Sequence, residues 1–420
     1  MKYDTGDTAW VLASAALVLF MTPGLALFYG GMVRAKNVLA MLMNNFWCMG
    51  IVSLLWAMGA YSLAFHGDNG FIGDLDLGWM HNAATTFPSG FGQSGDLLLL
   101  TVPPLAYMAF QLMFAIITPA LITGAIADRI RWAAWAWFVP IWLVLVYAPI
   151  AHWVFSPSGW LFKRGALDFA GGTVVHINAG IAALAAVLIL GKRKNWPGHP
   201  MPPHSLPLTL IGAGILWFGW FGFNAGSALA GSDLAAQALV NTHMAAAAAM
   251  CSWLLVERLN SGHATTLGAA SGLVAGLVAI TPCAGFVGGM SPIYIGLIAG
   301  AICALAVSLK FKFGYDDSLD VGGVHLVGGI VGSLLVGVFA DTAFNSAGTD
   351  GLVESGKFDL LGEQALAVIV TMAWSFTVTA IIMLVLKNVL PKGIRASEED
   401  EEAGLDLTQH SETGYSLDMA

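Results

Sequence analysis

The chain has 420 residues, of which 57% are hydrophobic and 10% are charged, and its mean hydropathy is +0.75. These values exclude an ordinary soluble domain and indicate an all-α integral membrane protein. The net charge of −9 does not suggest a nucleic-acid partner, because eight acidic residues crowd the last 23 positions and dominate the total. Four cysteines without C-x-x-C spacing suggest neither a zinc site nor a disulfide framework, so we expect no metal and no cofactor.

Apolar runs long enough to cross a bilayer recur along the chain. Each crossing needs about 20 apolar residues for a hydrocarbon core about 30 Å thick. The first run is too long, and too acidic at its start, for a cleaved signal peptide, so we expect it to remain in the mature protein. Eleven spans are predicted, at residues 9–33, 38–65, 102–127, 132–154, 170–191, 207–230, 234–256, 265–281, 292–310, 322–341 and 362–388.

Basic residues concentrate at alternate ends of these spans. Thirteen of the 17 Lys and Arg residues fall at one set of ends and four at the other, which is a clear positive-inside bias. An odd number of spans puts the two termini on opposite sides. We therefore expect the N-terminus outside the cell, a transmembrane domain over residues 1–391, and a cytoplasmic acidic tail over residues 392–420.

Glycines recur at four-residue spacing in three places. Such stripes allow helices to approach closely and to pack by van der Waals contact, so they predict a tight bundle. The stripes comprise Gly222 and Gly226; Gly268, Gly272 and Gly276; and Gly296 and Gly300.

Two stretches, DFAGGTVVHINAG at 168–180 and DVGGVHLVGGIVG at 320–332, each place an acid, a glycine pair and a histidine at a predicted span. Five spans separate the two, so they run in opposite directions, as expected of two inverted five-helix repeats followed by one long final helix. Eight helical residues put His176 about 12 Å deeper than Asp168, which can therefore sit at the outer mouth. One histidine alone could be a packing residue and Asp168 a helix cap. The symmetric pair of intramembrane histidines favours a function.

Aromatic residues form a third feature. Phe110 and Phe114 are four residues apart and share a helix face, and WFGFNAGSA follows at 220–228. Aromatic faces can attract a cation by roughly 0.5–2 kcal/mol. Periodicity alone, however, favours ordinary core packing.

Taken in order, the motifs of the chain resemble the ammonium transporter family, in its bacterial form. The resemblance implies a fold of two inverted halves, a homotrimer with one pore per subunit, and selective ammonium uptake across the inner (cytoplasmic) membrane. The motifs cover essentially the whole chain: ADRIRW, DFAGGTVVHINAG, GWFGFNAGSA, VNT at 240–242, DVGGVHLVGGIVG and the tail GLDLTQHSETGY.

The resemblance also implies residue roles. His176 and His325 match the family's paired pore histidines, Phe114 and Phe223 its stacked phenylalanine gate, and Trp220 a pore-wall aromatic. The outer recruitment site is matched by Phe114, Phe155, Ser227 and Asp168.

One position departs from the family pattern. Where the family has a tryptophan after an A-H-x-V run, this chain reads AHWVF and offers Phe155, with Trp153 two residues earlier. Phenylalanine presents a weaker face to a cation than tryptophan. The change moves the chain slightly toward the related Rh glycoproteins, which leaves an Rh-like electroneutral ammonia channel as an alternative.

Selectivity can be argued from chemistry. Carrying an intact ion through a dry pore costs several kcal/mol, and a filter for ammonium's size would admit potassium, but ammonium alone can give up a proton. Neutral imidazoles can donate to or accept from ammonia, and histidine can pass a proton near neutral pH. We hypothesise that ammonia follows the pore while His176 and His325 relay the proton, so that transport is electrogenic.

Two other classes are weaker. An intramembrane enzyme would need a nucleophile or metal triad beside the histidines, and no residue has suitable spacing, so we expect no enzymatic activity. An ammonium sensor normally carries a large signalling domain, and only 29 residues follow Pro391. By composition those residues look disordered. In the resembling family such a tail packs on the cytoplasmic face of a neighbouring subunit, where a PII-type signal protein docks.

Overall fold

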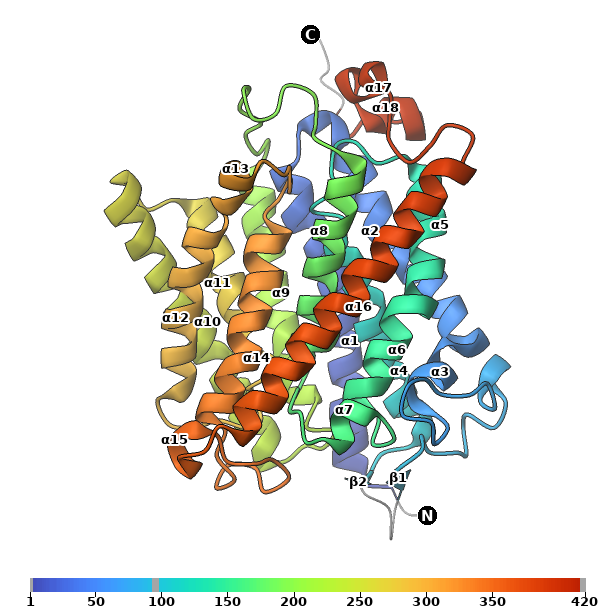
Figure 1. Cartoon of the computed structure of the whole chain (residues 1–420), viewed down its shortest axis with the longest axis vertical. Helices are drawn as coiled ribbons and strands as arrows, with labels where there is room; N and C mark the ends of the chain where they lie inside the picture. Colours follow the sequence, from blue (N-terminus) through green and yellow to red (C-terminus); the bar gives the residue numbers. More distant parts are fainter. Residues whose placement is uncertain (1–2, 93–97, 416–420) are drawn as a thin grey trace.

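The computed structural model describes residues 3–92 and 98–415, and these are almost entirely helical (Figure 1). Ten helices in this part of the chain are long and apolar enough to cross a membrane, and α11 (Thr266–Ile280) is a shorter apolar helix of 15 residues. Each of the eleven predicted spans matches one of these elements. The described residues also contain a two-stranded parallel pairing of β1 (Phe91–Gly92) with β2 (Leu98–Leu99).

The first half of the chain supplies five spans, three of which include a π-helical segment. In chain order they are α1 (Thr5–Met32); α2 (Val38–Leu55), η2 (Trp56–Ala60) and α3 (Tyr61–Phe65); α4 (Pro104–Ile122); α5 (Trp132–Trp142), η4 (Leu143–Tyr147) and α6 (Ala148–Phe155); and η5 (Gly172–Ile177) with α8 (Asn178–Leu190).

The second half repeats the count and adds one long helix. Its spans are α9 (Leu206–Gly226), α10 (Asp233–Ser261), α11, α12 (Ser291–Ala306), η6 (Gly322–Leu326) with α14 (Val327–Phe339), and finally α16 (Asp359–Val389). Shorter helices at the ends of the bundle are α7 (Trp160–Lys163), α13 (Leu309–Phe313) and α15 (Leu352–Ser355).

The fifth and tenth spans run in opposite directions. In Figure 1, α8 rises from the end that holds α7, whereas α14 descends from α13 toward α15. The η5 segment contacts α14 and the η6 segment contacts α8. Two segments about 150 residues apart in the sequence therefore cross side by side, as the inverted-repeat prediction requires.

The glycine stripes are sites of close helix contact. A Cβ atom at Gly272 would lie 2.7 Å from Trp253 Cβ of α10, and one at Gly276 would lie 2.5 Å from the Ala245 carbonyl oxygen. A Cβ atom at Gly222 of α9 would lie 2.7 Å from Leu17 Cβ of α1. The predicted tight packing is therefore confirmed at these helix pairs.

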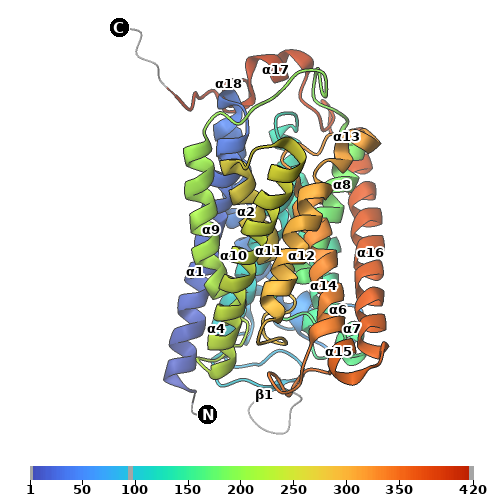
Figure 2. The same ribbon diagram turned by 90° about the vertical axis from the view of Figure 1, so that its left-hand side faces the viewer.

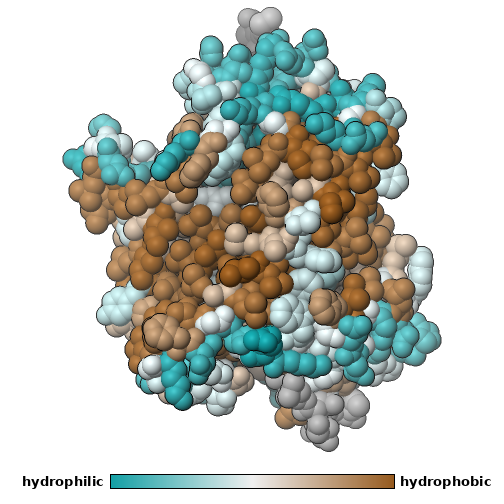
Figure 3. All heavy atoms as spheres, viewed as in Figure 1, coloured by the Kyte–Doolittle hydropathy of each residue, from teal (hydrophilic) through white to brown (hydrophobic). Residues whose placement is uncertain are grey.

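On the face shown in Figure 3, an apolar band lies between two polar ends. Figure 2 shows the spans roughly aligned with the long axis, with the N-terminus at one end and α17 (Glu398–Ala403) and α18 (Leu405–His410) at the other. The disorder that composition suggests for the tail is wrong for residues 398–410, which form α17 and α18 and do not project freely from the bundle. Instead, Glu401 and Asp406 are buried at 1% exposure each against the end of the bundle.

Candidate functional site

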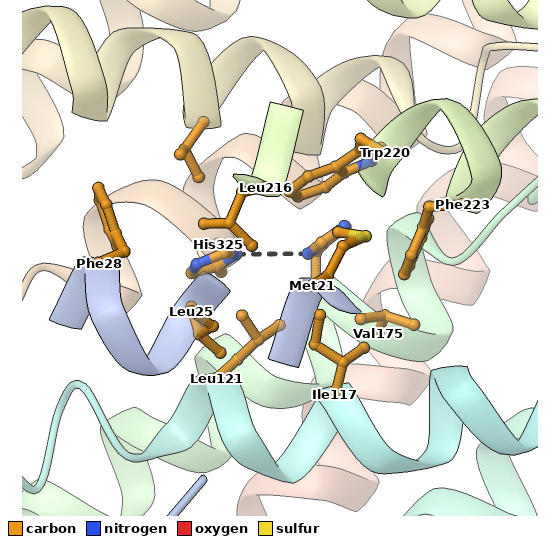
Figure 4. A pocket seen from close by; sticks show the side chains of 12 residues that line it. Met21, Leu25, Phe28, Ile117, Leu121, Val175, Leu216, Trp220, Phe223 and His325 are labelled. Atoms are coloured by element: carbon orange, nitrogen blue, oxygen red, sulfur yellow. Dashed lines mark hydrogen bonds between the residues drawn. The ribbon is translucent and has the colours of Figure 1, made fainter. Parts of the chain in front are cut away.

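The paired histidines meet inside the bundle. His176 belongs to η5 and His325 to η6, and their Nδ1 atoms lie 3.3 Å apart. The ring centroids are 5.4 Å apart with an interplanar angle of 17°. Both side chains are almost fully buried, at 1% and 2% exposure. In Figure 4 the dashed line from His325 marks this hydrogen bond.

A small cavity runs along the two imidazoles. Its volume is about 10 Å³, close to the minimum that accommodates one water-sized molecule. Apart from the histidines its walls are apolar side chains, and Figure 4 shows these side chains arranged around His325. They are Met21, Leu25, Phe28, Ile117, Leu121, Val175, Leu216, Trp220, Phe223 and Val274.

Trp220 forms one wall of this cavity. Its ring stacks on His176, with centroids 5.3 Å apart and an angle of 18°, and its Nε1 donates to Thr281 Oγ1 at 2.9 Å. The Nε2 atom of His176 has no hydrogen-bond partner among the described residues. A buried imidazole nitrogen without a partner is an unsatisfied polar group, so a small polar molecule in the cavity would satisfy it.

A second, larger cavity of about 430 Å³ opens toward the N-terminal end of the bundle. All four predicted recruitment residues line it: Phe114, Phe155, Ser227 and Asp168. The Ser227 hydroxyl donates to the Phe223 carbonyl at 2.9 Å. Because the hydroxyl proton is used in this bond, the lone pairs of the oxygen can accept from a cationic donor.

Phe114 and Phe223 lie between the two cavities. Their ring centroids are 4.3 Å apart with an angle of 35°, and both side chains are 1% exposed. Phe114 lines the larger cavity and Phe223 the smaller one. The pair therefore lies between the larger cavity and the histidines.

The position of Phe155 distinguishes it from Trp153. Phe155 lies edge-on to Phe114, with centroids 6.4 Å apart and an angle of 89°, and it faces the larger cavity. Trp153 points elsewhere, since its Nε1 donates to the Phe71 carbonyl at 2.6 Å and its ring packs against Trp374 at 5.4 Å. Of the two candidates, Phe155 is the one that lines the larger cavity.

Asp168 caps the helix that carries His176. Its Oδ1 accepts from the backbone N–H groups of Gly171 and Gly172, both at 2.7 Å, and its Oδ2 accepts from the Thr173 backbone at 2.8 Å and from the Thr173 hydroxyl. Burial raises the pKa of Asp168, although these bonds oppose the rise. Asp168 is therefore a helix cap, and it also lines the larger cavity.

The second half has an equivalent cap that sequence analysis missed. Asp317 Oδ1 accepts from the Val321 N–H at 3.1 Å, and Oδ2 accepts from the Gly322 N–H at 2.7 Å. Sequence analysis paired Asp320 with Asp168, but the structure makes Asp317 the counterpart. The signal was present, since Asp317 precedes His325 by eight residues, the same separation as Asp168 from His176.

Asp320 instead corresponds in position to Gly171 of the first half. Asp320 has a φ of +63° and Gly171 has a φ of +118°, so both halves turn left-handed at the same step before the histidine helix. The Asp320 carboxylate pairs with Lys310 Nζ at 2.6 Å. Aspartate is among the non-glycine residues that adopt a positive φ more readily than most.

Two further side chains at the site were not predicted. Tyr29 Oη lies 3.5 Å from His325 Nε2 and donates to the Leu121 carbonyl at 3.3 Å. Gln111 lines the larger cavity, and its Oε1 is buried without a hydrogen-bond partner in the described residues. Gln111 could have been found from its position one turn before Phe114 on the same helix face.

Comparison with known proteins gives concordant results. The model of a family described as "Ammonium Transporter Family" matches residues 9–415. An ammonium transporter of Mycobacterium tuberculosis is 50% identical over 438 residues, which cover 99% of this chain and 91% of the relative.

Solved structures agree with this match. Mep2 of Saccharomyces cerevisiae superposes with a TM-score of 0.85 at 36% identity, covering 95% of this chain and 91% of that one. A structure titled "Sensor Amt Protein" gives a TM-score of 0.86 at 31% identity, covering 96% of this chain and 97% of that one.

Proposed function

The chain belongs to the ammonium transporter family and is a multi-pass membrane protein that transports ammonium, and from this premise we propose how it does so. Ammonium is recruited in the larger cavity, the outer chamber of this mechanism, and gives up a proton there. Ammonia then passes the Phe114–Phe223 gate and the histidine pair, while the proton travels separately through His176 and His325. Transport is therefore electrogenic, because one positive charge crosses for each molecule carried.

The chemistry of the outer chamber supports recruitment at its inner end. The aromatic faces of Phe114 and Phe155 offer cation–π attraction, and the Ser227 oxygen offers an acceptor for an ammonium N–H. Asp168 adds a carboxylate at the same wall. Together these groups can hold a small cation that has lost part of its hydration shell.

The observation that carries the relay proposal is the direct contact between the two imidazoles. An Nδ1–Nδ1 distance of 3.3 Å allows one ring to donate to the other. The surrounding walls are apolar, so an intact cation would face a large desolvation cost at this point. Neutral ammonia would not, and a separate proton path removes the need for the ion to pass.

Proteoliposome recordings test the electrogenic mechanism directly. Purified protein should give a transient current on a solid-supported membrane after an ammonium pulse, and a potassium pulse should give none. Uptake should also change with an imposed membrane potential. Equal ammonium uptake with and without a potential would contradict the proposal and favour an Rh-like electroneutral channel, whereas absence of uptake would favour an ammonium sensor.

The similar protein of Mycobacterium tuberculosis is an ammonium transporter, and we infer that this chain carries out no enzymatic reaction. The positive-inside bias of the sequence supports placement of the N-terminus outside and the tail in the cytoplasm. On that topology the larger cavity faces the outside of the inner membrane. The division into a transmembrane domain, 1–391, and a regulatory tail, 392–420, belongs to the same proposal.

A homotrimer is supported by the outer face of α9 and α10. His243 is exposed within the apolar span of α10, where its ring stacks on Trp217 at 5.3 Å between centroids. An imidazole that faced lipid at this depth would be costly, so we propose that a neighbouring subunit covers it. Native mass spectrometry in detergent should give three chains per particle, and monomers alone would contradict this.

Regulation is proposed to act through the tail. A PII-type signal protein is the partner that the family resemblance implies at the cytoplasmic face. The many contacts of the tail with the ends of the spans support a role in controlling the inner mouth. Co-purification with a PII-type protein, with and without residues 392–420, would test whether such a partner binds.

A further inference from the structure

Three metal-ligating side chains converge in the loop after α3. One donor atom from each of His66, Asp74 and Asp76 lies within 4.8 Å of the other two, and His66 Nδ1 is 2.7 Å from Asp74 Oδ1. The loop lies on the side of the bundle that holds the N-terminus (Figure 1). The expectation of no metal site rested on cysteine spacing, which is uninformative about a cluster of histidine and aspartate.

We propose that His66, Asp74 and Asp76 form a binding site for a transition-metal dication, with Zn²⁺ as the ion that fits best. Zinc takes imidazole nitrogen and carboxylate oxygen at about 2.0–2.2 Å, commonly with three protein ligands and one water. Calcium and magnesium prefer all-oxygen sets with six or more ligands. The imidazole therefore selects for zinc and against the hard cations.

Carboxylate oxygens of Asp74 and Asp76 that accept no hydrogen bond among the described residues support a bound cation at this cluster. In the described part of the chain, the Asp74 carboxylate is hydrogen-bonded only through Oδ1, by His66, the Ser62 hydroxyl and the Asp76 backbone N–H. Its Oδ2 remains available. Among the described residues, the Asp76 carboxylate has neither a hydrogen-bond partner nor an ion-pair partner, although it lies beside another carboxylate.

Charge balance points the same way. Residues 66–103 contain four aspartates and neither Lys nor Arg. No lysine or arginine of this loop can therefore neutralise the two adjacent carboxylates, and His66 pairs with Asp74 alone. A divalent cation would do so, and it can reach the cluster from solvent because the side chains of His66 and Asp74 are 19% and 40% exposed.

Backbone contacts hold the three ligands in position without a metal. The Gly73 N–H donates to the Leu63 carbonyl at 2.7 Å, and the Asp74 N–H donates to the His66 carbonyl at 3.3 Å. Gly67 has a φ of +86°, and a Cβ atom there would lie 2.9 Å from Asp74 Oδ2. The glycine thus leaves room at the free carboxylate oxygen.

The site is connected to the outer chamber. The Gly67 N–H donates to Ser89 Oγ at 2.8 Å, and Phe91, two residues further on, lines the larger cavity. Zinc bound next to Gly67 would stabilise the loop that carries Phe91 to the wall of the larger cavity. The site itself does not depend on the electrogenic mechanism, so its test is independent of that proposal.

Equilibrium dialysis of the full chain in detergent against ZnCl₂, after chelator treatment, tests the site. Zinc measured by mass spectrometry should reach about one ion per chain, and excess Ca²⁺ or Mg²⁺ should not displace it. The variant Asp76→Asn, whose carboxylate makes no hydrogen bond in the fold, should weaken zinc binding by at least about ten-fold. The matched control is Asp68→Asn, an exposed aspartate of the same loop that is not in the cluster.

Thermal melting gives a second measurement. Zinc should raise the melting temperature of the parent and of Asp68→Asn but not of Asp76→Asn or His66→Gln. The inference is overturned if the parent binds no zinc, if Ca²⁺ competes equally, or if Asp68→Asn loses as much affinity as Asp76→Asn. Should Asp76→Asn melt abnormally without metal, His66→Gln decides by the same criteria.

Discussion

His176 lies in a small apolar cavity, where the free-energy cost of holding a charged solute is much greater than that of holding a neutral one. It contacts His325, stacks on Trp220 and leaves Nε2 without a partner in the described residues. A neutral ring in this place can exchange hydrogen bonds with ammonia but offers no compensating charge to potassium. The side chain at position 176 should therefore decide which solutes pass.

Replacement of His176 by aspartate should convert the pore to a cation path. A buried carboxylate is costly unless water or a cation accompanies it, so His176→Asp should admit water and pass a potassium current that the parent lacks. His176→Leu should keep the pore dry, break the relay and abolish ammonium-driven current. Solid-supported-membrane recordings under ammonium and potassium pulses measure both. If both variants keep parental ammonium current and exclude potassium, His176 is a packing residue.

In the proposed mechanism, Phe155 contributes to the recruitment of ammonium at the outer chamber, which it lines. Phe155→Trp should strengthen binding by up to about 1 kcal/mol, several-fold in half-saturation, because tryptophan presents the stronger cation–π face. The conservative control Trp153→Phe should leave half-saturation unchanged, since Trp153 packs against Trp374 away from the chamber. An unchanged half-saturation in Phe155→Trp, or an equal shift in the control, would remove Phe155 from the recruitment site.

At the scale of the element, η5 and η6, the segments that carry the two histidines, begin with the same kind of aspartate cap. An aspartate eight residues before the histidine accepts two or more backbone N–H groups, and a left-handed residue follows it three positions later. The free N–H groups at a helix start need such acceptors. The caps fix where η5 and η6 begin and so determine the depth of both imidazoles.

Removal of the second cap should disturb the inner half of the pore. Asp317→Ala leaves the Val321 and Gly322 N–H groups without their acceptor and should cost about 0.5–2 kcal/mol of stability. Asp317→Asn keeps an acceptor oxygen and should cost less. Melting temperatures and ammonium currents of the two variants measure this. Equal melting temperatures for the parent and Asp317→Ala would show that the cap is not needed.

The same residue predicts a pH dependence. Burial, and after it the nearby charge of Asp320, raises the pKa of Asp317 to about 6. Because the folded state holds this proton more tightly than the unfolded state, the contribution to stability is present below about pH 4 and is lost as pH rises through about 6. The melting temperature of the parent should therefore fall relative to that of Asp317→Asn across this range. A constant difference between the two proteins would contradict the raised pKa.

At the scale of the whole molecule, the tail contacts segments that lie far apart in the sequence. Asp406 accepts from the Leu39 and Ala40 N–H groups at the start of α2, at 3.0 and 2.8 Å. The buried Glu401 pairs with Arg395 at 2.9 Å and accepts from the Lys194 N–H at 2.8 Å. The contacts of Asp406 and of Glu401 with the Lys194 N–H connect the start of α2 with the segment that follows α8, at an end of the bundle where the Arg193–Asp316 ion pair also joins distant segments.

Truncation after Pro391 should reduce ammonium transport while leaving trimers intact, because the truncation removes these contacts but no span. The substitution Asp406→Ala should produce part of the same loss, since it removes two helix-start acceptors. Flux in proteoliposomes and native mass spectrometry measure the two properties separately. Full activity of the truncated protein would refute a regulatory role for the tail.

Sequence alone determined the class, the eleven spans and the histidine pair. Hydropathy acts along a continuous segment, because each helix in lipid must satisfy its own backbone hydrogen bonds and bury about 20 apolar residues. Histidines in such segments stand out locally, so no tertiary information was needed to select His176 and His325. The same reasoning located the glycine stripes.

Only the tertiary structure decided which groups act together. Asp317 rather than Asp320 matches Asp168 because the cap is defined by backbone N–H positions, and Phe155 rather than Trp153 faces the chamber because of the rotation of α6. The tail is acidic and polar by composition, yet its helices dock because Glu401 and Asp406 accept from the backbone N–H groups of Lys194, Leu39 and Ala40, which lie far away in the sequence. Such pairings depend on the packing of segments far apart in the sequence, which local composition does not encode.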